Sequence, residues 1–240
     1  MKNENRARRF AGIALLSLLL PIAMLMAKDF WEQKNYTKWN ENECMALLTE
    51  SPWARTQMIP GNYTTATPRM MDASKGKTAG SGGSLMDTQG LGGSDSIPFY
   101  VRWYSSVRIR QGMGRLAQFR SHMTDEQINQ IISAPMPDYQ VGIVGRSMGI
   151  FDAANLEMIK GKTFLLSKQD KTKKIELKNY TPPKERPDGV AMFIFPRTAD
   201  GKPVIEAADD EIIFVTEIGK LKVRAVFKLA KMMVDGNLDM

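Results

Sequence analysis

The stretch DEIIFVTEIGKLKVRAVFKL, residues 210–229, contains two mainly apolar runs that also carry charged residues, joined by Gly219-Lys220. A two-residue connection with glycine first is typical of a tight β-hairpin turn. Pairing outward from this turn puts the large apolar side chains on one face, and a slip of one residue would move them all to the other face. The pairs on that face are Ile218 with Leu221, Thr216 with Val223, Phe214 with Ala225, and Ile212 with Phe227. We therefore predict an antiparallel hairpin that packs one face on a core.

The opposite face of this hairpin is charged. The predicted register sets Glu217 across from Lys222 and Glu211 across from Lys228, so that opposite charges meet across the ladder. The basic residues of the segment are Lys220, Lys222, Arg224 and Lys228. We interpret them as a solvated face. Weak binding of an anion or a nucleic acid is the alternative, and it predicts binding that weakens as the salt concentration rises.

The residues before the hairpin predict further strands and several helices. FYVRWY, residues 99–104, has the period-two alternation of a strand. Ser105 or Ser106 begins one helix. Thr124 and Gln127 form the capping box of a second helix. Other strands are expected at 138–146, 162–168, 173–180 and 189–196, and another helix at 151–161. We predict the α+β class, with a mainly antiparallel sheet, a C-terminal β-meander, two or three helices and an N-terminal helical segment.

The N-terminus has the composition of an export signal. MKNENRARR, residues 1–9, is basic, and the apolar run FAGIALLSLLLPIAMLMA, residues 10–27, ends in a small residue. We predict that residues 1–27 are a signal peptide directing export to the periplasm or cell envelope, with cleavage after Ala27. An uncleaved anchor is the alternative, because the apolar run just reaches membrane-spanning length. Without these residues the net charge falls from +7 to +4, since they carry four basic side chains and one acidic side chain. This weakens a nucleic-acid interpretation, which requires a concentrated basic surface.

Composition divides the rest of the chain into three parts. Residues 28–64 form an aromatic helical segment that we expect to dock on a main domain at residues 97–240. Between them, residues 65–96 contain seven glycines and little aliphatic periodicity. Such a composition cannot bury enough apolar surface to offset the conformational entropy lost on ordering. We therefore predict a disordered linker there.

The sequence GRSMG, residues 145–149, matches the G-x-S-x-G nucleophile elbow and follows a predicted strand. A serine nucleophile needs a base that accepts its proton. No histidine follows Ser147, and the single histidine, His122, precedes it by 25 residues. Nothing in the sequence places the amine of Lys160 beside it. We therefore predict a protein that is not an enzyme, and an exported serine hydrolase using Ser147 is the alternative.

The remaining motifs predict no cofactor and no metal site. One histidine and one cysteine cannot form a zinc site. Residues 198–211 lack the ligand order of a calcium loop, and their acidic residues are most simply a polar turn before the hairpin. The single cysteine, Cys44, permits no internal disulfide and should behave as a small buried hydrophobe.

YTKWNENECMALLTESPWA, residues 36–54, places two tryptophans around a short helix. Asn40 and Glu43 resemble a capping pair, and Ser51-Pro52 ends the helix. The simplest interpretation is that this helix and its flanking indoles pack on the main body. The alternative is an aromatic platform for a glycan or peptide. Its candidate ligand-binding residues are Trp31, Tyr36, Trp39 and Trp53.

Several of these segments resemble a family of uncharacterised exported bacterial proteins. In that family an aromatic-W-x-x-E segment ending in SPWA precedes a V-R-W strand, and a β-hairpin closes the chain. The matching segments are 36–54, 99–110, 193–198 and 211–240. The resemblance implies export and a small α+β domain, and it implies no activity.

The expected role is therefore an exported envelope protein that binds or scaffolds a partner without catalysis. The sequence does not identify the partner; another envelope protein or a glycan is the candidate, and nucleic acid is not favoured. Membrane contact is expected only through the N-terminal segment, if that segment is not removed.

Overall fold

The computed structural model describes residues 29–60 and 96–240. These residues belong to two compact units that divide after Trp39. The predicted signal peptide, residues 1–27, and residues 65–95 of the predicted linker lie outside the described residues. The smaller unit contains helix α1 (Phe30–Gln33) and the 3-10 helix η2 (Tyr36–Lys38).

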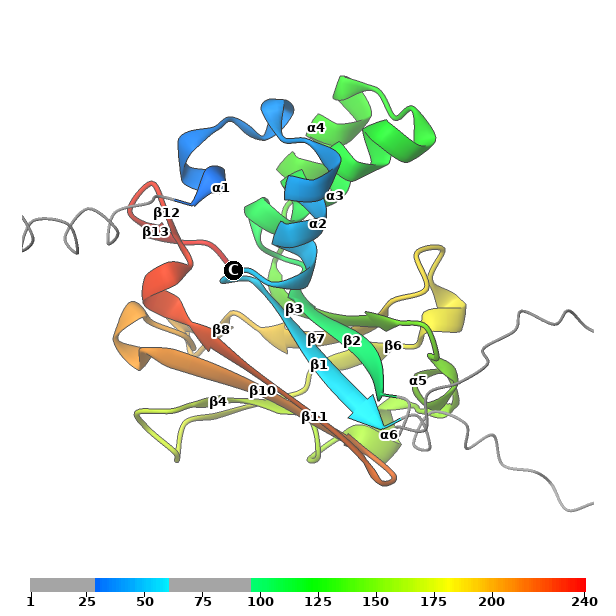
Figure 1. The fold of residues 1–240 in the computed structure, drawn as a ribbon. Helices are drawn as coiled ribbons and strands as arrows, with labels where there is room; N and C mark the ends of the chain where they lie inside the picture. Colours follow the sequence, from blue (N-terminus) through cyan, green and yellow to red (C-terminus); the bar gives the residue numbers. More distant parts are fainter. Residues whose placement is uncertain (1–28, 61–95) are drawn as a thin grey trace, which may run out of the picture. The chain divides into compact units, whose positions relative to one another are not determined.

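The larger unit combines antiparallel sheets with several helices, which confirms the predicted α+β class (Figure 1). Its helices are α2 (Glu41–Thr49), α3 (Val107–Ser121), α4 (Asp125–Ser133), α5 (Gly149–Ala153) and α6 (Leu156–Ile159). One sheet has the order β1 (Ala54–Pro60), β2 (Ser96–Trp103), β3 (Asp138–Gly145), β7 (Ala191–Pro196) and β6 (Asn179–Thr181). The other has the order β11 (Leu221–Lys228), β10 (Glu211–Ile218), β4 (Phe164–Ser167) and β5 (Lys174–Glu176). Two short hairpins join β8 (Thr198–Ala199) to β9 (Lys202–Pro203) and β12 (Met233–Val234) to β13 (Asn237–Leu238).

The C-terminal hairpin has the predicted register. Strands β10 and β11 pair from Ile218 with Leu221 to Glu211 with Lys228, and Gly219 turns the chain with a φ of 58°. A left-handed φ of this kind suits glycine, which has no side chain to clash with its own backbone. The inward face of the hairpin packs on the five-stranded sheet.

Aromatic rings fill the space between the two sheets. Phe214 of β10 lies edge-on to Phe193 of β7, with ring centroids 5.2 Å apart. Trp103 of β2 and Phe227 of β11 are also 5.2 Å apart. All four side chains are fully buried. The two inner sheet faces therefore interdigitate as in a β-sandwich.

Side chains of β1 cover the free edge of β11. Arg55 donates from Nε to the Val226 carbonyl at 2.9 Å. Gln57 donates from Nε2 to the Lys222 carbonyl at 3.1 Å, and its Oε1 accepts the backbone N–H of Arg224 at 2.7 Å. Unpaired edge groups are a template for unwanted strand addition, so these side chains both join the sheets and occupy that edge.

Helices α2, α3 and α4 begin where the sequence predicts. Ser106 is the N-cap of α3, and its side chain accepts the N–H of Ile109. Asn40 begins α2 with the predicted capping box, and Thr124 begins α4 in the same way. Helices α2 and α3 approach so closely that a Cβ at Gly112 would lie 2.8 Å from the Leu47 side chain. That close contact explains a glycine in the middle of a helix, where it otherwise costs stability.

Three boundaries differ from the prediction. Residues 54–60 are not part of a docked helical segment but form the edge strand β1, paired along its whole length with β2. The segment 151–161 is not one helix, because Ala154 is extended and Asn155 caps a second one, α6. The segment 173–180 is two strands in different sheets, so the predicted meander is divided between them.

Candidate ligand-binding groove

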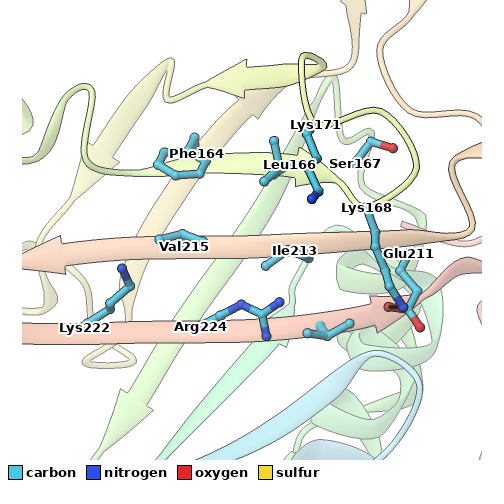
Figure 2. Close-up of a pocket in the computed structure, with 11 residues that line it drawn as sticks. Phe164, Leu166, Ser167, Lys168, Lys171, Glu211, Ile213, Val215, Lys222 and Arg224 are labelled. Atoms are coloured by element: carbon cyan, nitrogen blue, oxygen red, sulfur yellow. Dashed lines mark ion pairs between the residues drawn. The ribbon is translucent and has the colours of Figure 1, made fainter.

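A groove of about 640 Å³ lies on the outer face of β4, β10 and β11 (Figure 2). Sites for small organic ligands have volumes in this range. The groove lies on the side of these strands opposite the core, since residues at the alternate positions, such as Phe214 and Phe227, are buried between the sheets. The register of the hairpin therefore decides which side chains reach the groove.

The floor of the groove is apolar. It is formed by Phe164 and Leu166 of β4, Ile213 and Val215 of β10, and Val226 of β11. Ile213 and Val215 are each only 7% exposed. The outer face of an antiparallel sheet usually carries polar side chains, so an apolar strip across three strands is the informative feature here.

Basic side chains surround this floor. The four cations that line the groove are Lys168, Lys171, Lys222 and Arg224. Glu211 is the one acidic residue that lines it, so the lining has a surplus of three positive charges. Figure 2 shows Lys222 extending from β11 toward β10 and Arg224 lying along β11. Long cationic side chains can lie along apolar surface while their charged ends stay in water.

Two of these cations have acidic partners. Lys168 lies 2.9 Å from one carboxylate oxygen of Glu211, and Lys228 lies 3.7 Å from the other. Lys222 lies 2.5 Å from Glu217. The pairs across the hairpin are the two predicted from its register, so the interpretation of a charge-paired face is confirmed for Lys222 and Lys228.

The other two cations, Arg224 and Lys171, have no acidic partner within 4 Å among the residues that the structure describes. The backbone N–H of Arg224 is bound to Gln57, while its guanidinium extends over the groove. Lys171 belongs to the turn between β4 and β5 and reaches the groove from its opposite side. The groove thus contains two positive groups available to an incoming anion.

The ion pair between Lys168 and Glu211 fixes the charge at one end of the groove. The hydrogen bond from Lys168 holds the pKa of the Glu211 carboxyl below its ordinary value. The same bond raises the pKa of Lys168, while the positive charge of Arg224 acts against that rise. Both groups of this pair therefore stay charged at neutral pH.

A second hollow, of about 320 Å³, lies between α3 and strands β2 and β3. Its lining includes two arginines, and both have partners. Arg102 donates to the Leu48 carbonyl at 2.6 Å, and Arg120 pairs with Glu41 at 2.8 Å. The hollow is half the size of the groove and its arginines are already engaged, so the groove is the stronger candidate site.

The predicted aromatic residues do not line the groove. Trp31 is 8% exposed, Trp39 is fully buried, and Tyr36 is half-buried. Within the larger unit, Trp53 is 1% exposed and donates from its indole nitrogen to the Asp239 carbonyl at 2.8 Å. Burial leaves these three indoles little surface for a ligand.

Ser147 and His122 occupy separate elements. Ser147 is half-buried in the turn between β3 and α5. His122 is exposed at the C-terminus of α3, where its φ is 52°. Strand β3 pairs antiparallel with both of its neighbours, whereas a nucleophile elbow belongs to an α/β-hydrolase sheet. The hydrolase alternative stays a prediction without support from this arrangement.

Protein-family models, curated proteins and solved structures give no match to this chain. The family resemblance of the sequence therefore stays a prediction. Within residues 29–60 and 96–240, every helix is too short or too polar to cross a bilayer. The same ranges contain no cluster of three or more His, Cys, Asp and Glu residues suited to a metal ion.

Half of this site follows from the sequence. The predicted register puts Lys222 and Arg224 on the charged face of the hairpin, which we interpreted as a solvated face. Lys168 and Lys171 were missed because they lie more than 40 residues earlier and join the face only through the pairing of β4 with β10. One sequence feature could have indicated the site. Ile213, Val215 and Val226 lie on the charged face of the hairpin, and a fully solvated face usually carries polar residues instead.

Proposed function

We propose that this chain is an exported, non-enzymatic binding protein that holds an amphipathic anion in the groove on β4, β10 and β11. The observation that carries the proposal is the combination of an apolar floor with two cations, Arg224 and Lys171, that have no acidic partner among the described residues. Apolar surface favours an aliphatic or aromatic body, and the free guanidinium of Arg224 favours an acidic head. A free inorganic anion would leave the floor unused, and a neutral hydrocarbon would leave the cations unused.

The residues of the groove supply binding groups rather than reactive ones. Ser167 contributes the one hydroxyl among the lining residues, and this side chain is 1% exposed and accepts the N–H of Asp170. The proposed role is therefore capture or carriage of the ligand. Export is supported by the basic start and apolar run of residues 1–27.

The binding proposal is tested with 8-anilinonaphthalene-1-sulfonate, an aromatic anion whose fluorescence rises in apolar surroundings. We expect saturable binding to the folded chain. Arg224→Gln should weaken it about tenfold, which corresponds to one charged hydrogen bond. Val215→Thr, which makes the floor polar at nearly constant volume, should weaken it as well.

Lys220→Gln is the matched control, because it removes the same charge from the exposed turn of the hairpin outside the groove. It should leave binding unchanged. Near-ultraviolet circular dichroism establishes that each variant remains folded. Equal binding by wild type, Arg224→Gln and Val215→Thr would reject the groove as the site.

Export has its own test. In bacterial fractions the full chain should be found in the envelope or periplasm, and a chain that lacks residues 1–27 should stay in the cytoplasm. Mass spectrometry of the exported protein shows whether it begins at Lys28. Cytoplasmic accumulation of the full chain would contradict the proposed location.

A further inference from the structure

The two unpaired cations of the groove lie on opposite sides of its apolar floor. Arg224 extends from β11, and Lys171 from the turn after β4, with Leu166 and Ile213 between them (Figure 2). A third cation, Lys168, lies at the same end of the groove, although Glu211 already accepts its hydrogen bond at 2.9 Å. The positive charge is therefore concentrated at one end of the apolar strip.

The other end of the strip is less charged. Phe164 and Val215 form the floor there. Arg224 pairs with Val215 across the ladder, but its side chain runs along β11 away from this end, and the lining cation beyond it, Lys222, is paired with Glu217 at 2.5 Å. The groove thus has an apolar end and an end with two free positive charges. A ligand that matches it has an acidic head at Arg224 and Lys171 and an apolar chain over Phe164 and Val215.

From this arrangement we infer that the groove selects a single-chain amphiphile with a doubly charged phosphate head over one with a singly charged carboxylate head. The inference rests on the proposed binding function and specifies the ligand class. A phosphate monoester carries close to two negative charges at neutral pH and three acceptor oxygens. It can accept two parallel hydrogen bonds from the Arg224 guanidinium and still offer an oxygen to Lys171. A carboxylate has one charge and two oxygens, and so leaves one cation unmatched.

The shape of the groove favours a single chain over a membrane surface. Ile213 and Val215 are each 7% exposed, and cationic side chains lie beside them on both sides of the floor. A flexible alkyl chain can reach this floor, whereas a bilayer would meet only the cationic rim. The volume of about 640 Å³ suits one small amphiphile.

Isothermal titration calorimetry with dodecyl phosphate, dodecanoate and inorganic phosphate tests the inference at constant ionic strength, below the concentrations at which micelles form. We expect wild type to bind dodecyl phosphate about tenfold more tightly than dodecanoate, the change that corresponds to one further charged contact. Inorganic phosphate should bind much more weakly than dodecyl phosphate. Lys171→Gln and Arg224→Gln should each remove most of the preference, and Lys220→Gln should retain it.

The possible failures are separate. Equal affinity of wild type for dodecyl phosphate and dodecanoate would overturn the preference for phosphate and leave the proposed binding function standing. Binding of neither amphiphile would overturn both. If inorganic phosphate bound as tightly as dodecyl phosphate, the inference of a single-chain ligand would be overturned. It would also be overturned if the protein bound vesicles of anionic phospholipid but neither dissolved amphiphile. Thermal melting of each variant shows that a loss of preference is not a loss of fold.

Discussion

The carboxylate of Asp239 accepts a hydrogen bond of 2.7 Å from the hydroxyl of Ser106, which lies 133 residues earlier in the chain. The same carboxylate accepts the backbone N–H groups of Val107 at 2.6 Å and Arg108 at 3.1 Å. These groups belong to the first turn of α3, where free N–H groups and the helix dipole favour a negative charge. Through its backbone carbonyl, Asp239 also accepts the indole N–H of Trp53. One residue thus joins α3, the segment before β1 and the end of the chain.

Replacing Asp239 with Asn should destabilise this junction. The variant keeps the size of the side chain but removes the charge that three donors share. We expect Asp239→Asn to lower the free energy of unfolding by about 2 kcal/mol, from the cost of losing a charged cap. Urea unfolding followed by tryptophan fluorescence measures it. Asp235→Asn, an exposed turn residue, is the control and should change stability little, and equal stabilities for the two variants would contradict the role of Asp239.

A buried ion pair should make stability depend on acid pH. Asp209 is 6% exposed, and both of its carboxylate oxygens accept from Lys173, at 2.9 and 2.7 Å. Burial alone would raise the pKa of Asp209, but hydrogen bonds from the Glu206 N–H and from Lys173 outweigh it and lower that pKa below 3.8. A lowered pKa in the folded state means that the contribution is complete above the unfolded value of 3.8 and is lost as the pH falls through the folded value.

The variant Asp209→Asn tests this dependence. We expect it to be about 2 kcal/mol less stable than wild type at pH 7, and the difference should shrink below about pH 4. Urea unfolding at several pH values between 7 and 2.5 gives the comparison. Asp200→Asn, in the exposed turn between β8 and β9, is the matched control. A difference between wild type and Asp209→Asn that stays constant down to pH 2.5 would rule out the proposed electrostatic origin.

The sequence predicted the parts of the fold whose signals are local. The hairpin register follows from alternation around Gly219, and the helix starts follow from the capping residues Ser106 and Thr124. Strand β1 was missed because its half-buried positions 55 and 57 carry polar side chains, while Met58 is exposed. It therefore lacks the apolar alternation expected of a half-buried strand. Those polar side chains form hydrogen bonds with the edge of β11. Their partners lie about 170 residues further along the chain, so local sequence does not reveal this role.

The groove was predictable only in part for the same reason. Its hairpin side, with Arg224 opposite Val215, follows from the predicted register. Its other side depends on the pairing of Val215 with Phe164. Nothing in the sequence shows that the strands of these two residues, β10 and β4, pair with each other. Buried contacts such as Asp209 with Lys173 are equally invisible, because residues 198–211 have the composition of an exposed polar turn.

The thiol of Cys44 should be inert in the folded protein. The residue is fully buried on α2, and burial raises the pKa of the thiol to about 11. Because the thiolate is the reactive form, we expect 5,5′-dithiobis(2-nitrobenzoate) at pH 8 to label the native chain at least about 100-fold more slowly than the urea-unfolded chain. The unfolded chain should release one equivalent of thiol. Fast labelling of the native chain would show that Cys44 is accessible.

The raised pKa of Cys44 also predicts a loss of stability at alkaline pH. Between pH 9 and 11 the unfolded chain releases the thiol proton while the folded chain retains it, so the free energy of unfolding falls as the pH rises. Cys44→Ala has no thiol and should lack this component. Parallel urea titrations of the two chains from pH 8 to 10.5 isolate it, and identical pH profiles would contradict the burial of the thiol.

The GRSMG turn should not react as a serine nucleophile. Ser147 is not among the described non-glycine residues with positive φ, so its backbone lacks the strain of a nucleophile elbow. His122, the single histidine, caps the far end of α3. We expect a fluorophosphonate probe to leave the folded chain unlabelled, and Ser147→Ala to bind 8-anilinonaphthalene-1-sulfonate as wild type does. Stoichiometric labelling that disappears in Ser147→Ala would replace the binding proposal with an exported hydrolase, because only an activated hydroxyl attacks such a probe at a useful rate.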